Sequence, residues 1–230
     1  EKDVRRIDIV YVCSNSEIAR QNIQRLNVTG KNDFVLASRI TKDDVLGISW
    51  GATLTAVVDA IESIAAAEVV QLVGGVASAG LEVNGVELLR RLALRTGAPV
   101  WPLHAPFLVG SVATAQQLRR DPSLAPTIER FSAVTVAVLG IGSLVTGRSA
   151  LWAALDDDAR AELTAQGAVA DLGGCMVLDD GALVTAGVLG RFIAIDAERL
   201  RGVDEVIAVA GGEEKVEEIA AALRSGLVAT

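Results

Sequence analysis

Two hydrophobic patterns alternate along this chain. Short apolar runs, which are typical of buried strands, recur at residues 6–12, 34–37, 45–48, 68–73, 99–103, 133–139 and 206–210. Between these runs, apolar residues spaced three and four apart predict helices over residues 16–26, 53–67, 83–96, 111–119, 122–130, 156–166 and 214–225. This alternation predicts an α/β fold whose mostly parallel sheet carries helices on both faces.

The stretch around residues 145–195 is less regular, and we expect a small inserted lobe there. A strand-like segment at 167–178 is interrupted by Gly173-Gly174, and Asp180-Gly181 is typical of a hairpin turn. A last apolar segment at 227–230 indicates a further strand. Because no internal repeat or low-complexity linker divides the sequence, we expect one domain over all 230 residues.

Composition and charge narrow the class of protein. Hydrophobic residues make up 51% of the chain and aromatic residues only 3%, so aliphatic side chains must fill the core, as in helices packed on a parallel sheet. The formal net charge of −8 argues against a basic groove for nucleic acid. No signal peptide and no apolar run of membrane-spanning length is found, so we expect a cytoplasmic protein without membrane contact.

Cysteine and histidine usage bears on metals and redox chemistry. Cys13 and Cys175 lie far apart in apolar surroundings, and we expect both to be buried free thiols. A single histidine, His104, rules out most metal sites that are built from several histidines. We therefore expect neither a metal nor a cofactor. The chain begins with Glu1 rather than methionine, and we expect it to be a fragment of a longer protein.

Turns that contain glycine follow four predicted strands, at 47–53, 74–75, 140–143 and 211–212. Ligands of open α/β sheets bind at the carboxyl ends of the strands, and glycine lets backbone N–H groups approach an anion. The first turn adds the hydroxyls of Ser49 and Thr53 and leads into a helix, whose N-terminus favours negative charge. The spacing matches neither a dinucleotide fingerprint nor a P-loop. Two interpretations stay open: a phosphate cradle, or a turn that only packs a helix on a strand.

Four further side chains are candidates for ligand contact. Lys215 begins a helix, where a positive charge opposes the helix dipole unless it meets a bound anion; it could also be solvated. Asp171 could bind hydroxyls or act as a base, or could be a structural turn residue. His104 could bond a sugar hydroxyl, act as a base, or only belong to a loop. Trp50 could cover the ligand side of its turn, or pack on a neighbouring subunit.

Six segments appear in a characteristic order, at residues 47–54, 70–75, 105–106, 138–143, 167–171 and 209–215. Together they resemble the sugar-binding domain of the SorC family of bacterial transcriptional regulators, over roughly residues 40 to 230. The resemblance implies the fold shared by ribose-5-phosphate isomerase and glucosamine-6-phosphate deaminase. It also implies a sensor of sugars, usually phosphorylated, that assembles into a dimer or tetramer. Full-length members bind operator DNA through a preceding helix-turn-helix domain, which we expect to be missing here.

Under this hypothesis the 47–53 turn holds the phosphate, Lys215 pairs with it, and Gln71, His104 and Asp171 read the sugar hydroxyls. The predicted ligand contacts are Gly47, Ser49, Trp50, Gly51, Ala52, Thr53, Gln71, Gly74, His104, Gly140, Gly142, Asp171 and Lys215. One alternative is a sugar-phosphate isomerase or deaminase with Asp171 or Glu213 as the general base. The catalytic motifs of those enzymes are absent, so we expect no enzyme. The other alternative is a sensor of an unphosphorylated sugar or polyol.

Overall fold

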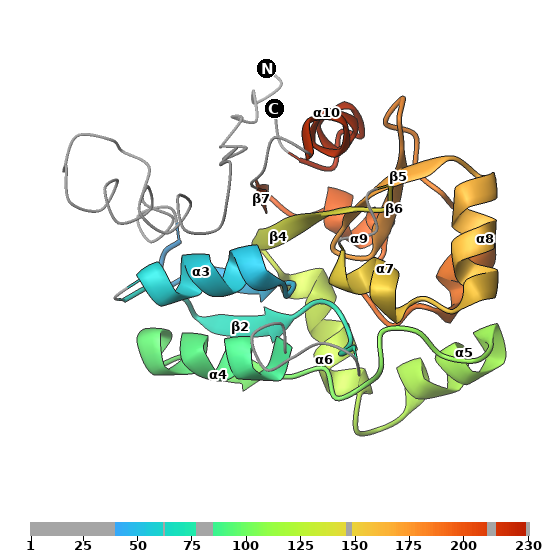
Figure 1. Cartoon of the computed structure of the whole chain (residues 1–230). Coiled ribbons are helices and arrows are strands. Elements are labelled where there is room, and N and C mark those ends of the chain that lie inside the picture. The colour runs from blue at the N-terminus through green and yellow to red at the C-terminus, as the bar shows by residue number, and fades with distance from the viewer. Residues whose placement is uncertain (1–39, 62, 77–84, 146–148, 211–214, 229–230) are drawn as a thin grey trace, which may run out of the picture.

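The structure is a computed structural model that describes residues 40–61, 63–76, 85–145, 149–210 and 215–228 (Figure 1). The strands predicted at 6–12 and 34–37 and the helix predicted at 16–26 lie outside the described residues. The same holds for Cys13 and for the predicted glycine turn at 211–212.

A parallel sheet forms the centre of the molecule. Its strands are β1 (Val45–Ile48), β2 (Glu68–Gln71), β3 (Val100–Trp101), β4 (Val136–Ser143) and β7 (Glu205–Val209). They lie side by side in the order β3-β2-β1-β4-β7 and are all parallel. The predicted mixed α/β fold with a mostly parallel sheet is therefore confirmed, and the carboxyl ends of β1 and β4 meet at one edge.

Strand β4 is longer than predicted. The sequence places its end at residue 139 and a turn at 140–143, but the strand runs on to Ser143. Its first part pairs with β1 and β7, and Ile141 to Ser143 then pair antiparallel with β5 (Ala168–Leu172). The predicted turn is therefore wrong, because a new strand partner takes over where the first pairing ends.

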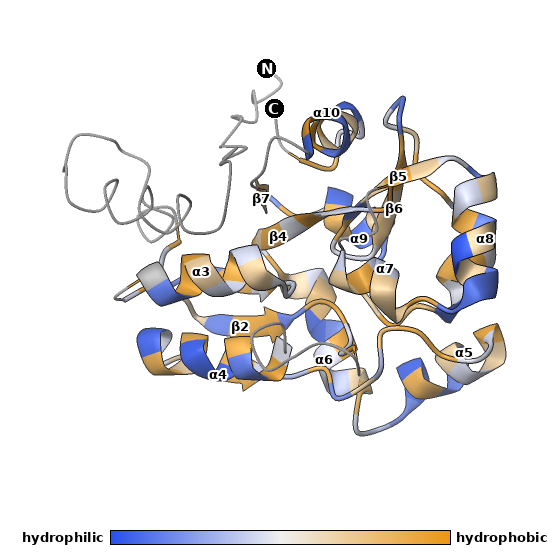
Figure 2. Cartoon of the chain, in the orientation of Figure 1, coloured by the Kyte–Doolittle hydropathy of each residue, from blue (hydrophilic) through white to orange (hydrophobic). Residues whose placement is uncertain are grey.

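Two hydrophobic clusters cover the two faces of the sheet. On one face, α3 (Ala52–Ala60) and α4 (Gly85–Thr96) pack on inward-facing residues of β1, β2, β4 and β7. The other cluster holds alternate residues of the same strands together with α5 (Val112–Arg120), α6 (Ala125–Arg130) and α10 (Val216–Arg224). Figure 2 shows hydrophobic colours along much of β4, and mixed hydrophilic and hydrophobic colours along α4 and α8 (Asp157–Ala165).

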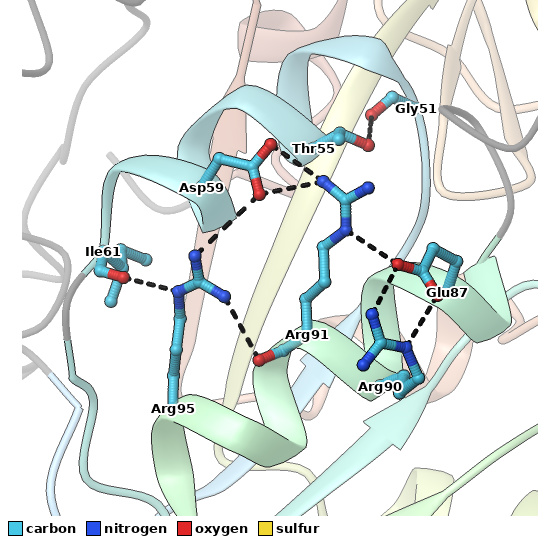
Figure 3. A network of polar contacts seen from close by, with 8 residues as sticks. All are labelled: Gly51, Thr55, Asp59, Ile61, Glu87, Arg90, Arg91 and Arg95. Atoms are coloured by element: carbon cyan, nitrogen blue, oxygen red, sulfur yellow. Dashed lines mark hydrogen bonds and ion pairs between the residues drawn. The ribbon is translucent and has the colours of Figure 1, made fainter.

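Helix α3 is shorter than the predicted span of 53–67, because it ends at Ala60 and Ile61 adopts an extended conformation. Ion pairs hold its last turn on α4 (Figure 3). Arg91 of α4 places Nη1 2.8 Å from Asp59 and donates from Nε to Glu87, which also binds Arg90. Arg95 donates to the carbonyl oxygen of Ile61 at the end of the helix. The network therefore ties the end of α3 that lies away from the sheet's carboxyl edge.

The region of the predicted lobe, described at residue 145 and over 149–195, contains two α-helices, a hairpin and a 3₁₀ helix. Its elements are α7 (Ala150–Ala154), α8, β5, β6 (Cys175–Leu178) and the 3₁₀ helix η3 (Gly187–Arg191). The interruption at Gly173-Gly174 is the turn that joins the antiparallel strands β5 and β6. The predicted turn at Asp180-Gly181 is confirmed, since the Gly181 N–H bonds to the Leu178 carbonyl oxygen at 2.9 Å.

The remaining elements are η2 (Phe131–Ala133) and α9 (Ala197–Arg201). The strand expected at 227–230 is wrong for its described part, because residues 227 and 228 belong to no strand. Cys175 is a buried free thiol, as expected, and burial raises its pKa to about 12. None of the described helices is both long and apolar enough to cross a membrane.

Candidate ligand-binding site

A cavity of about 240 Å³ opens at the carboxyl ends of β1 and β4. Its walls come from several parts of the chain: the turn from β1 into α3, Val73 after β2, the end of β4, β5 with the β5–β6 turn, the start of α7 and the N-cap of α10. Nine of the thirteen predicted contacts line it, namely Ser49, Trp50, Gly51, Ala52, Thr53, Gly140, Gly142, Asp171 and Lys215. Residues that are far apart in the sequence thus surround one space.

The turn from β1 into α3 presents backbone donors to this cavity. Gly51 is the N-cap of α3 with φ of +141°, a conformation that side chains with a Cβ rarely adopt. The first intrahelical bond joins the Thr55 N–H to the Gly51 carbonyl oxygen, so the amides of Ala52 and Thr53 precede the helical ladder. Such a helix start attracts anions through its N–H groups and its dipole.

Ser49 and Trp50 hold this turn in place. The Ser49 hydroxyl accepts a hydrogen bond from the Gly140 N–H at 3.2 Å, which joins the ends of β1 and β4. Trp50 is 8% exposed, and its indole donates from Nε1 to the Gly74 carbonyl oxygen at 2.8 Å. The structure therefore gives Trp50 an internal partner in addition to its place in the cavity wall.

The glycines of β4 leave space for neighbouring polar groups. A Cβ on Gly142 would lie 2.9 Å from the Ser149 hydroxyl and 3.2 Å from Asp171 Oδ2. Asp171 sits on β5 directly opposite Gly142 in the antiparallel pair. A larger residue at position 142 would therefore clash with the Asp171 carboxylate and the Ser149 hydroxyl. This explains why glycine occupies a position inside a strand.

Asp171 contributes a carboxyl side chain to the cavity lining. The residue is 7% exposed, and Oδ1 accepts a hydrogen bond from the Gly174 N–H at 2.7 Å. Burial raises the pKa of Asp171 to about 7, although the Gly174 bond and the charge of Lys215 act in the opposite direction. Near neutral pH this carboxyl can therefore both donate and accept hydrogen bonds.

Lys215 contributes a positively charged side chain to the cavity lining. It is the N-cap residue of α10, and its Nζ donates to the Ile141 carbonyl oxygen on β4 at 2.9 Å. One turn further along the same helix, the buried Glu218 accepts a hydrogen bond from the Ser143 hydroxyl, also on β4. These two polar contacts fix α10 along the end of the strand and hold the ammonium group at the cavity.

Four predicted contacts lie outside the cavity lining. Gly47 is a packing glycine, because a Cβ there would lie 2.7 Å from a Leu72 side-chain carbon. The Gln71 amide is engaged within the protein: Nε2 donates to the Val73 carbonyl oxygen and Oε1 accepts from the Leu103 N–H. A Cβ on Gly74 would meet the Ala105 carbonyl oxygen at 2.8 Å. His104 is exposed on a loop.

Several lining residues were not among the predicted contacts. They are Leu54, Val73, Ile141, Ser149, Ala150, Leu151, Gly173 and Gly174. Ser149 carried a readable signal, since a serine before an apolar run is a helix N-cap, and its hydroxyl accepts a weak 3.4 Å bond from the Trp152 N–H. The other seven offer only backbone or apolar atoms, which no sequence motif marks as a site. No cluster of metal-binding side chains occurs in the described ranges.

Comparison with known proteins also indicates a sugar-binding domain. The family model of the sugar-binding domain named Sugar-bind matches residues 4–230. The erythritol catabolism regulatory protein EryD of Brucella abortus is 25% identical over 186 residues, which are 80% of this chain and 58% of EryD. This chain thus spans less than two thirds of the length of that relative.

Solved structures share the fold. A transcriptional regulator from Streptococcus pneumoniae matches with a TM-score of 0.85 and 22% identity, over 97% of this chain and 86% of that one. The full-length sorbitol operon regulator SorC from Klebsiella pneumoniae matches with a TM-score of 0.81 and 20% identity, over 97% of this chain and 72% of that one. The resemblance drawn from the six sequence segments is confirmed, and this chain belongs to the family of sugar-binding domains found in SorC-type transcriptional regulators.

Proposed function

We propose that this chain is the effector-sensing part of a bacterial transcriptional regulator and that its cavity binds a phosphorylated sugar or a related polyol. The observation that carries the proposal is the cavity itself, where a helix N-terminus, an ammonium group and a buried carboxyl surround one space at the sheet's carboxyl edge. Ligands of open α/β sheets bind at this edge.

The phosphate would lie at the start of α3. There the amides of Ala52 and Thr53 and the Thr53 hydroxyl are donors that match phosphate oxygens. Lys215 would contribute a positive charge from the opposite wall, while its bond to Ile141 keeps the ammonium in place. An anion also offsets the cost of placing a lysine at the N-terminus of α10.

The sugar hydroxyls would lie toward Asp171 and Ser149. A carboxyl with a pKa of about 7 can donate to one hydroxyl oxygen and accept from another, which suits a polyhydroxylated ligand. Gly142 leaves the room that such a ligand needs beside these two side chains. The cavity would thus have an anion-binding end and a hydroxyl-binding end.

Effector binding would be transmitted to DNA by another part of the full-length protein, acting as a homo-oligomer. The matched relatives are longer than this chain and are regulators by name, so we propose no catalytic role. Asp171 is the residue that an isomerase on this fold would use as a base. Turnover of ribose 5-phosphate that disappears in Asp171→Asn would overturn the proposal.

The position of the phosphate is tested with matched substitutions. Thr53→Ala should weaken binding of a sugar phosphate by about 1.5–3 kcal/mol, the usual contribution of a hydrogen bond to a charged group. Thr164→Ala is the control, since Thr164 is exposed on α8. Lys215→Met should weaken the same ligand, whereas Lys42→Met at an exposed position should not. If calorimetry gave equal affinities within each matched pair, the phosphate would not bind at the start of α3.

A further inference from the structure

Two further cavities, in addition to the candidate sugar pocket, are lined by the Arg119 side chain. One has a volume of about 340 Å³ and the other of about 480 Å³, which is within the range of small-molecule sites. Both are lined by Arg119, Ala194 and Asp196. The larger one shares Gly174 with the lining of the sugar pocket, and the smaller one shares no lining residue with it.

Arg119 is a half-buried guanidinium whose charge is poorly compensated. Nη2 donates to the Phe192 carbonyl oxygen at 2.6 Å, and within the described part of the chain Arg119 takes part in no ion pair. A guanidinium has five donors, so one backbone contact leaves most of them available. Burying a charge without an opposite charge is costly, which makes such a group a natural anchor for an anion.

A second arginine converges on the same place. Arg199 of α9 lines the smaller cavity together with Arg119. Burial lowers the pKa of Arg119, and the positive charge of Arg199 lowers it further, while Asp196 acts in the opposite direction. Asp196 is engaged already, since it caps α9 through the Arg199 N–H and lies 3.4 Å from the Arg199 guanidinium. Two guanidinium groups and one carboxylate thus line the smaller cavity, and that carboxylate already pairs with Arg199.

The rest of the smaller cavity's lining is apolar, whereas Thr185, Glu198 and Arg201 also line the larger one. The smaller cavity is closed by Ile128, Phe131 and Ile193, and the larger one by Leu183, Leu189 and Phe192. An inorganic ion would leave these walls uncovered. A molecule with an apolar body and one anionic group would cover them and still reach the arginines.

We propose that Arg119 and Arg199 anchor a second ligand, a small organic carboxylate with an aromatic or branched apolar body, at a site separate from the sugar pocket. The carboxylate would accept hydrogen bonds from the free edge of the Arg119 guanidinium, in the two-oxygen geometry that arginine favours. The apolar body would occupy the smaller cavity beside Phe131, which Arg119 and Arg199 both line. This site does not depend on the sugar pocket having any ligand.

Benzoate is the probe, and benzamide, which has the same shape without the charge, is its control. We expect benzoate to bind in calorimetry and to raise the melting temperature, and benzamide to do neither at the same concentration. Arg119→Gln should reduce benzoate affinity about tenfold or more, because a charge-assisted pair is lost. Arg120→Gln, the exposed neighbour on the same helix, should change it by less than about twofold.

Two further variants keep the test decisive. Arg119→Gln also removes the contact to Phe192 and could unfold the protein, whereas Arg199→Gln keeps that contact and should still weaken benzoate several-fold. Lys215→Met, in the sugar pocket, should leave benzoate affinity unchanged. A failure of the benzoate proposal can therefore be told apart from a failure of the proposed function. Equal binding of benzoate and benzamide, unchanged affinity in Arg199→Gln, or loss of benzoate in Lys215→Met would overturn the proposal.

Discussion

The buried carboxyl of Asp171 should make the stability of this protein depend on pH. The residue is 7% exposed, and burial holds its pKa at about 7 in the folded state, against 3.8 for an ordinary aspartate. The folded state therefore binds this proton more tightly than the unfolded chain does. A group with a raised folded pKa gives its full stabilisation below the unfolded pKa, and that stabilisation is lost as the pH rises through the folded pKa.

The size of the effect follows from the two pKa values. Between pH 5 and pH 6 the unfolded aspartate is ionised while the folded one is mostly protonated, so unfolding releases close to one proton, and about half a proton at pH 7. Each pH unit then lowers the free energy of unfolding by about 1.4 kcal/mol, which gives about 2–3 kcal/mol between pH 5 and pH 8. The slope flattens above pH 7, because both states are then ionised.

Asp171→Asn removes this proton while it keeps the shape of the side chain. We expect the free energy of unfolding in urea to fall from pH 5 to pH 8 in the wild type and to fall about 2–3 kcal/mol less in Asp171→Asn. Asp204→Asn is the matched control, since Asp204 is exposed, and it should follow the wild type. Parallel pH curves for wild type and Asp171→Asn would refute a carboxyl that is protonated in the folded state.

Three other predictions concern parts of the fold that support the site. Gly47→Ala should lower the free energy of unfolding by about 1–3 kcal/mol in urea, because the added methyl would overlap a Leu72 side-chain carbon. Ser143→Ala should cost about 1–3 kcal/mol in the same assay, since the buried Glu218 carboxyl loses its hydroxyl donor; an unchanged midpoint would deny that bond. The Glu87 carboxyl should titrate by NMR with a pKa of about 2, held down by bonds from two arginines, and a value near 4.5 would show that the α3–α4 network is open in solution.

Much of the fold was readable from hydrophobic pattern. The strand at 45–48 was predicted with the bounds that the structure gives β1, because a short apolar run followed by a glycine turn is typical of a buried strand. The error at β4 has a physical cause. Gly140 and Gly142 look like turn residues, but they lie inside a strand that exchanges parallel partners for an antiparallel one. Strand pairing of that kind depends on β5, which is about 30 residues further along the chain.

The site was predicted less completely than the fold. Nine of the thirteen predicted contacts line one cavity, because the position of the carboxyl ends follows from the parallel sheet. Gln71 stands at such an end too, yet its amide bonds backbone groups of Val73 and Leu103. A polar residue that reads a ligand and one that satisfies the backbone look alike in sequence. Whether the cavity residues bind a sugar phosphate stays a prediction.

The most direct test of the central claim is a thermal-shift scan with sugars and their phosphate esters in matched pairs. A ligand that binds only the folded state raises the melting temperature by mass action. The account predicts a rise with at least one phosphate ester and a smaller or absent rise with the parent sugar, since the start of α3 and Lys215 address the phosphate. A rise with a free sugar or polyol that its phosphate ester does not produce would contradict the account.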